Sequence, residues 1–294
     1  MGGLGRDDRL RLVITKFTFS LKSLTRLGSR IAFIVKSEAR LLIILFFVGA
    51  ISICFSARAV NTTIDYGEPE NLTGTVYADG TLTRVLFTFR RTATRSGSTV
   101  QVYRDFYLPD GTLAARERVI YQGGQLKSFS LDDFQIGSRG SAVVQPSARE
   151  AKMNFQYAVG TTRRNGNEKF MDQILVNDMV GQYISSHWEA LARGQVLKCR
   201  VVSIPRAETV GFKFFKESET TWHGKPVMIV KAQPTSFLIA QLVAPLHFIV
   251  DKTGAHNVLE YTGRTTPKFR KNGKWEDLDA VTVIDWNGTS RAGN

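Results

Sequence analysis

Cysteine is scarce in this chain, which has only Cys54 and Cys199 among its 294 residues. Cys199 is the sole cysteine after residue 59, so the larger C-terminal part of the chain cannot form an intrachain disulfide. The core of that part must therefore be held together by buried apolar surface. With 43% hydrophobic and 22% charged residues, the composition is that of a folded protein and not of a disordered one.

Residues that carry common catalytic chemistry are also few. The four histidines (His187, His223, His247 and His256) are scattered without metal-binding spacing, so we predict no metal site and no cofactor. The chain has no G-x-S-x-G elbow, no P-loop and no dinucleotide-binding glycine motif. We therefore predict no catalytic residues and no enzymatic activity. A hydrolase with an unrecognised site around His223 or His256 remains the less favoured alternative.

Positive charge is concentrated near the N-terminus. The whole chain has a net charge of +13, and residues 1–40 contain nine basic and three acidic residues, a net charge of +6. An uncharged apolar segment, residues 41–57, follows directly. A basic tail before an apolar segment predicts that the tail stays in the cytosol while the rest of the chain crosses the membrane. The apolar residues of the tail favour an interfacial helix on anionic lipid over a nucleic-acid-binding role.

The apolar segment has two interpretations. Seventeen helical residues cover roughly 26 Å, which is enough for a short transmembrane helix and equally for a signal sequence. Ala57 and Ala59 provide the small residues that signal peptidase requires, so cleavage after Ala59 is the second possibility. The chain is therefore expected to be a single-pass protein of the bacterial inner membrane, anchored by residues 41–58 with a periplasmic C-terminal domain, or a cleaved periplasmic protein.

Residues 60–294 are predicted to form one exported, β-rich domain. Its first strand-like runs are LTGTVYA, TLTRVLFTFRR, TVQVYRDFYL and TLAARERVIY, separated by glycine-containing turns about every 12 residues. Such spacing indicates an antiparallel meander. Alternation along these runs places Phe87 and Phe89 on one face of the second strand and Phe106 on the apolar face of the third.

Helical periodicity appears once in the middle of the domain. Asn177 is a candidate N-cap, and Val180, Ile184, Trp188 and Leu191 follow at helical spacing, which predicts one amphipathic helix over 178–193. Six more strand-like runs follow. They are interrupted by the apolar segment 235–245, which is expected to form a short buried helix or an apolar flap. The predicted fold class is therefore mainly β (α+β), with an N-terminal membrane helix ahead of the sheet.

The distribution of aromatic residues suggests a binding groove. A sheet curved around a helix can leave an apolar groove, which binds acyl chains or other apolar ligands through buried area alone. We predict that the ligand-binding residues are Phe87, Phe89, Phe106, Ile184, Trp188, Phe212, Phe214, Phe237, Leu238 and Leu242. The alternative is that these side chains fill a closed core.

Two segments interleave basic and aromatic residues. Arg90, Arg91 and Arg95 form one, and the segment 268–275, KFRKNGKW, forms the other. Such patterns are typical of polyanion-binding sites. Outside a membrane, an acidic lipid or a cell-wall polymer suits them better than a nucleic acid. A solvated hairpin tip explains the second segment without any ligand.

Two stretches, 185–217 and 236–267, resemble a group of uncharacterised bacterial periplasmic proteins. The similarity is carried by a helix ending in Trp188, Leu191 and Gly194, and by a turn with Pro205, Arg206 and Glu208. The order of elements is similar to that of the half-barrel lipoprotein and lipid carriers of the bacterial envelope. This resemblance implies a curved antiparallel sheet, a half-barrel, cupping one amphipathic helix and a short apolar helix. The long basic tail departs from the pattern of a soluble carrier.

Together these features predict a non-enzymatic cell-envelope protein whose membrane-delivered β domain binds a lipid or other apolar ligand. Its expected partners are the membrane, through residues 41–58, the apolar ligand and an envelope protein, with no nucleic acid. The alternative is a structural or assembly protein that acts through protein–protein contacts. That alternative predicts a closed core and an exposed apolar patch.

Overall fold

The computed structural model describes residues 71–147, 149–171, 173–241 and 243–286. These residues belong to one compact unit, Thr62–Asn294. The basic tail and the predicted membrane segment lie outside the described residues. Within the described part of the chain, no helix combines the length and apolar character needed to cross a membrane.

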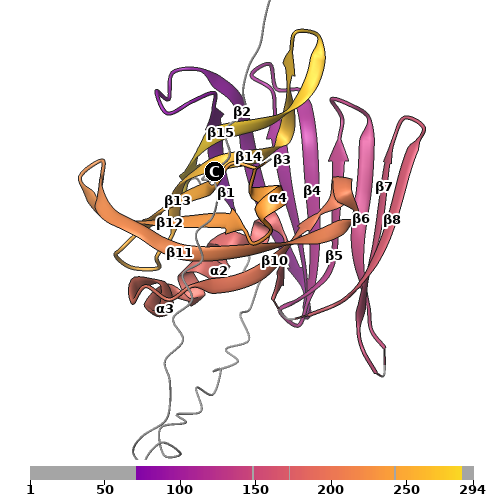
Figure 1. Cartoon of the computed structure of the whole chain (residues 1–294). Helices are drawn as coiled ribbons and strands as arrows, with labels where there is room; N and C mark the ends of the chain where they lie inside the picture. Colours follow the sequence, from indigo (N-terminus) through magenta and orange to yellow (C-terminus); the bar gives the residue numbers. More distant parts are fainter. Residues whose placement is uncertain (1–70, 148, 172, 242, 287–294) are drawn as a thin grey trace, which may run out of the picture. The chain divides into compact units, whose positions relative to one another are not determined.

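The first half of the described chain is an antiparallel meander (Figure 1). Its strands are β1 (Leu72–Tyr77), β2 (Val85–Ser96), β3 (Thr99–Tyr107), β4 (Leu113–Gln122), β5 (Gln125–Asp133), β6 (Ser138–Gln145), β7 (Lys152–Val159) and β8 (Thr162–Lys169). The four predicted strands correspond to β1–β4. The turn between β2 and β3 places Gly97 at a φ of 59°, a backbone conformation that glycine adopts without strain.

The second half begins with short helices and returns to strands. Its elements are β9 (Ile174–Leu175), the 3-10 helix η1 (Asn177–Met179), α2 (Val180–Ser186), α3 (Trp188–Ala192), β10 (Leu197–Ser203), the 3-10 helix η2 (Ile204–Arg206), β11 (Glu208–Trp222), β12 (Lys225–Pro234), α4 (Phe237–Ala240), β13 (Leu246–Asp251), β14 (Val258–Lys271) and β15 (Lys274–Asp285). Because β15 pairs with β1, the fifteen strands in the described residues form one sheet, ordered β8 to β1 and then β15 to β9.

The prediction of one continuous helix over 178–193 is wrong. The segment consists of η1, α2 and α3, with a break at His187. Trp188 stacks flat on His256, with ring centroids 3.9 Å apart, and this tertiary contact redirects the chain after α2. Asn177 does not cap the helix, because its side-chain amide donates to Glu117 instead (2.7 Å). The amphipathic pattern is retained, since Ile184 and Leu191 are buried.

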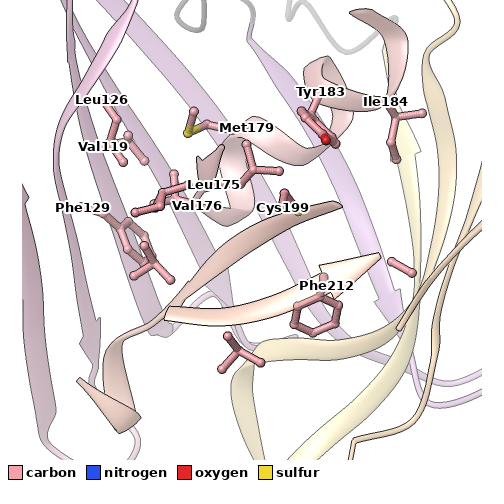
Figure 2. Close-up of a cluster of buried hydrophobic side chains, with 14 of the residues drawn as sticks. Val119, Leu126, Phe129, Leu175, Val176, Met179, Tyr183, Ile184, Cys199 and Phe212 are labelled. Atoms are coloured by element: carbon pink, nitrogen blue, oxygen red, sulfur yellow. The ribbon is translucent and has the colours of Figure 1, made fainter. Parts of the chain in front are cut away.

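The sheet is open and curved, and α2 lies on its concave face (Figure 1). Side chains from both halves of the sheet enter one buried cluster around the helices. Figure 2 shows members of this cluster from β5 (Leu126, Phe129), from α2 (Ile184) and from β11 (Phe212). The core therefore sits inside the curve of the sheet, and the helices form part of it.

The segment around η2 joins the two ends of the sheet. Gly166 of β8 lies so close to Ala207 that a Cβ atom at this glycine would overlap the Ala207 carbonyl oxygen. Next to it, the Thr209 backbone N–H donates to the Glu168 side chain of β8 (2.9 Å). These contacts hold the β8 end against the β10–β11 end without strand pairing between them.

The close contact at Gly166 predicts a stability effect. Replacing Gly166 with alanine should lower the free energy of unfolding by about 1–3 kcal/mol, because the obstructing atom belongs to the backbone and cannot rotate away. Gly80→Ala is the matched control, since a Cβ atom there meets nothing within 4 Å. Chemical denaturation of the two variants measures the difference. Equal stability of G166A and G80A would contradict the contact.

Candidate functional site

A cavity of about 330 Å³ lies between α2 and the concave face of the sheet. This volume falls at the lower end of the range of ligand sites, roughly 300–1,000 Å³. Its apolar walls come from strands in both halves and include Leu72, Phe89, Phe106, Phe212, Phe214, Phe248 and Ile284. Residues of α2, among them Gly181 and Gln182, form the opposite wall. The concave face is therefore hollow next to α2 and not filled by side chains.

Two rows of side chains cross the floor of the sheet under this cavity. In the register of β1–β4, Arg91 pairs with Arg104, and Arg104 pairs with Glu117. Two residues along each strand, and hence on the same face, Phe89 pairs with Phe106. An aromatic row and a charged row thus lie side by side.

The space for the Phe89 ring comes from Gly74 on the neighbouring strand β1. Gly74 pairs with Phe89 in the sheet, and a Cβ atom at Gly74 would overlap this ring. Because Gly74 has no side chain, the Phe89 ring can lie over the Gly74 backbone, along the surface of the sheet. A larger residue at this position would push the ring toward the cavity.

Asp178 of η1 forms an ion pair with Arg91, which is one end of the charged row. It accepts hydrogen bonds from Arg91 at both carboxylate oxygens (2.6 and 3.1 Å) and one from the Tyr121 hydroxyl (2.8 Å). Only 2% of the Asp178 side chain is exposed. Burial by itself would raise the pKa of Asp178, but the charge and hydrogen bonds of Arg91 and the charge of Arg104 lower it below its usual value. Asp178 is therefore ionised at neutral pH.

Glu117 of β4 is the other end of the row and forms an ion pair with Arg104. It is almost completely buried and accepts hydrogen bonds from Arg104 Nη1 (2.8 Å), Asn177 Nδ2 (2.7 Å) and the Thr266 hydroxyl. Since Asn177 and Asp178 are adjacent in η1, this short helix is bonded to Glu117 at one end of the row and to Arg91 at the other. The network fixes the start of α2 over the cavity floor.

Arg104 lines the cavity, as do Arg91 and Arg264, and it lies next to the aromatic row. Its guanidinium lies 5.6 Å from the Phe89 ring centroid and 5.7 Å from that of Phe106. Within the described residues, it donates one hydrogen bond, to Glu117, out of five N–H groups. About 19% of its side chain is exposed, and it lines the cavity. Arg104 therefore presents hydrogen-bond donors and positive charge beside an apolar wall.

Two tryptophans mark the edges of this site. Trp286 lines the cavity and donates from its indole N–H to the Val258 carbonyl oxygen (2.7 Å). Trp188 of α3 stacks on His256, which also lines the cavity. These contacts tie the helices and the end of β15 to the β13–β14 turn.

Of the ten predicted groove residues, the cavity brings together four: Phe89, Phe106, Phe212 and Phe214. Phe87 belongs to a separate buried cluster with Val76 and Leu86, and Ile184 is fully buried in the main core. Trp188 stacks at the cavity edge. Phe237 and Leu238 on α4 are 75% and 72% exposed and do not line this cavity. Leu242 lies outside the described residues.

The charged row was not predicted from the sequence. Arg91 was grouped with Arg90 and Arg95 as part of a polyanion site, whereas its side chain pairs with Asp178 in the interior. Alternation places Arg91 on the same strand face as Phe89, which is the one signal that separates it from Arg90. Its partner Asp178 lies 87 residues away. No local pattern connects these two residues.

No metal centre appears in the part of the chain that the structure describes, where no group of three His, Cys, Asp or Glu residues could hold an ion. Cys199 is buried, and burial raises its pKa to about 12. Its thiol is therefore protonated at neutral pH and unsuited to nucleophilic attack. His223 lies in the turn between β11 and β12, with its ring edge-on to that of Trp222 (centroids 4.3 Å apart). The arrangement at the cavity can bind and orient a ligand.

Removing the buried charge of Asp178 should destabilise the fold. Asp178→Asn removes the carboxylate charge that faces the buried Arg91 guanidinium, so we expect the free energy of unfolding to fall by about 3–5 kcal/mol. Glu189→Gln is the control, because its ion pair with Arg193 is exposed and should contribute less than about 1 kcal/mol. Urea denaturation at pH 7 measures both. Similar losses in the two variants would contradict the role of the buried pair.

The lowered pKa of Asp178 also predicts a dependence on pH. A carboxylate whose pKa is lower in the folded state adds stability above its unfolded pKa of about 3.9, and this contribution is lost as the pH falls through the folded value. The free energy of unfolding should therefore fall below about pH 4. Other carboxylates contribute to the same decline, so the informative quantity is the difference between wild type and D178N. That difference should shrink as the pH is lowered, and a constant difference would contradict the prediction.

Comparisons with known proteins identify no family for this chain. No protein-family model matches, and no curated protein matches significantly. Among solved structures, a putative outer membrane lipoprotein-sorting protein domain from Vibrio parahaemolyticus is 8% identical, covering 76% of this chain and 86% of its own, with a TM-score of 0.25. A porin-like protein from Bacteroides uniformis is 8% identical, covering 74% and 96%, with a TM-score of 0.20. Similarities this weak assign neither a family nor a function to the chain.

Proposed function

We propose that this protein binds a lipid or another apolar molecule in the cavity beneath α2. The observation that carries the proposal is the combination of an open cavity, an aromatic floor and the Arg104 guanidinium beside that floor. A few polar groups in a mostly apolar pocket are typical of small-molecule binding sites. The proposed role is binding without catalysis.

The chemistry of the walls favours a particular orientation of the ligand. An acyl chain or ring system would pack against Phe89, Phe106 and Phe214, gaining about 25 cal/mol for each Å² of apolar surface removed from water. A polar end would face Arg104, whose N–H groups next to the cavity can donate charge-assisted hydrogen bonds. The aromatic row would thus provide affinity, and Arg104 would set the orientation.

The proposed location is the cell envelope. Its support is the sequence: a basic tail, the apolar segment 41–58 and the small residues at the candidate cleavage site. In this proposal the segment is a membrane anchor or a signal sequence, and the β domain works in the periplasm of a bacterium. The open curved sheet with a helix on its concave face is compatible with the half-barrel architecture that the resemblance implies.

A second candidate function is contact with another envelope protein. It is favoured by Phe237 and Leu238, which are the most exposed large apolar side chains in the described residues. They are neighbours on α4, a helix without a buried residue, in a segment free of charged side chains. Such a surface suits a protein contact and needs no cavity.

A larger side chain inside the cavity beneath α2 distinguishes ligand binding from the protein contact through α4. Gly181 of α2 lines the cavity, and a Cβ atom there would meet only Val258 Cγ2, at 3.8 Å. Gly181→Leu should therefore extend into the open space without disturbing the core, while Gly181→Ala is the matched control that leaves most of the space free. The full chain would be isolated from an envelope fraction without harsh detergent and analysed by native mass spectrometry with lipid extraction.

We expect a bound apolar molecule in the wild type and in G181A, and an empty G181L protein. Retention of the molecule by G181L would place it elsewhere on the chain. A consistently empty, folded wild type would contradict the proposal and favour the protein contact through α4.

A further inference from the structure

A second cavity lies at another part of the sheet. It has a volume of about 510 Å³ and is bounded by the start of β2, the β3–β4 turn and the hairpin of β14 and β15. Figure 1 shows this gold hairpin next to the ends of the meander strands. The Lys268 backbone N–H donates to the Gln135 side chain (3.0 Å), which fastens the hairpin to the turn after β5. None of the residues that line this cavity lines the first one.

The charged residues of the second cavity are all basic. They are Arg84, Lys268 and Arg270. Lys268 forms an ion pair with Asp277, whereas neither arginine has a carboxylate within ion-pair distance among the described residues. Asp79 is influenced by the charge of Arg84 but forms no ion pair with it. The two guanidinium groups therefore carry positive charge that no ion pair within the described residues neutralises.

Aromatic side chains support these two arginines. The Arg84 guanidinium lies 5.6 Å from the Phe269 ring centroid, and that of Arg270 lies 5.8 Å from the Trp275 ring centroid. Stacking of this kind holds a guanidinium in place while leaving its N–H groups available.

The same cavity collects exposed apolar surface. Of the eight large apolar side chains that are exposed in the described residues, three line it: Val85 at 39%, Phe134 at 52% and Trp275 at 40% exposure. Apolar side chains gathered around a hollow and left in water are typical of a binding site. The basic and aromatic segment 268–275 is therefore part of a cavity wall and more than a solvated hairpin tip.

We infer that this second cavity binds a molecule with an apolar body and an anionic group, such as a phosphate, sulfate or carboxylate. The apolar body packs against Phe134 and Trp275, and the anion is held by Arg84 and Arg270. An acidic lipid and a free anionic amphiphile share this chemistry. The inference concerns a site separate from the first cavity and does not depend on the function proposed there.

The test uses hexyl phosphate, with hexanol and inorganic phosphate as matched probes. The full chain in lipid nanodiscs would be titrated by calorimetry, with empty nanodiscs as the blank. Hexyl phosphate should bind saturably. The double variant R84Q/R270Q should weaken that binding at least about tenfold, because two charge-assisted hydrogen-bond donors are lost. Arg139→Gln, which removes one exposed positive charge on β6, should leave the affinity unchanged.

Two further measurements show which cavity binds the probe and whether the natural ligand is an acidic lipid or a free amphiphile. G181L should leave unchanged the hexyl phosphate binding that R84Q/R270Q weakens, since Gly181 lines the first cavity only. If an acidic lipid is the natural occupant, nanodiscs rich in phosphatidylglycerol should weaken the apparent affinity for hexyl phosphate by competition. If the occupant is a free amphiphile, the affinity should be the same in neutral and acidic discs.

Three results would overturn the inference. Equal binding of hexanol would show that the anion contributes nothing, and equal binding of inorganic phosphate would show that the apolar wall contributes nothing. Loss of hexyl phosphate binding in G181L, with full binding in R84Q/R270Q, would place the probe in the first cavity.

Discussion

The buried ion pair between Arg91 and Asp178 is the interaction on which the arrangement of the site depends. Transferring two charges from water to the interior costs several kcal/mol for each ion, so such a pair persists only when its geometry satisfies both partners. Here both carboxylate oxygens of Asp178 accept hydrogen bonds. A displacement of η1 would lengthen or break these bonds. The pair therefore gives η1, and α2 after it, one defined position over the sheet.

This constraint explains how an open cavity persists next to a close-packed core. Apolar side chains alone would favour collapse of α2 onto the sheet, because burial is non-directional. Asn177 and Asp178 instead bind Glu117 and Arg91 on the sheet floor, which sets the spacing between helix and sheet. Arg104, between these contacts, is left facing the cavity. The polar network thus holds the site open and places the Arg104 guanidinium at its floor.

Part of this organisation follows from local sequence patterns. Strands β1–β4 were predictable because aromatic and branched residues alternate between glycine turns, whereas β8, TRRNGNEK, is polar throughout and has no such alternation. The break at His187 depends on the contact of Trp188 with His256, which is remote in sequence. Phe89 and Phe106 were predicted as groove residues from their strand faces. The pairing of Arg104 with Glu117 depends on strand register, which no single segment encodes.

The central claim is that an apolar molecule occupies the cavity under α2. Trp286 lies in the wall of this cavity, so its fluorescence can report a bound molecule. The most direct measurement is quenching of tryptophan fluorescence of the full chain by a brominated decanoate, compared with Trp286→Phe and with Trp275→Phe in the second cavity. This claim predicts saturable quenching in the wild type and in W275F, and a smaller saturable amplitude in W286F, where Trp188 and Trp275 still report bound molecules. Quenching that does not saturate, or that is unchanged in W286F, would contradict it.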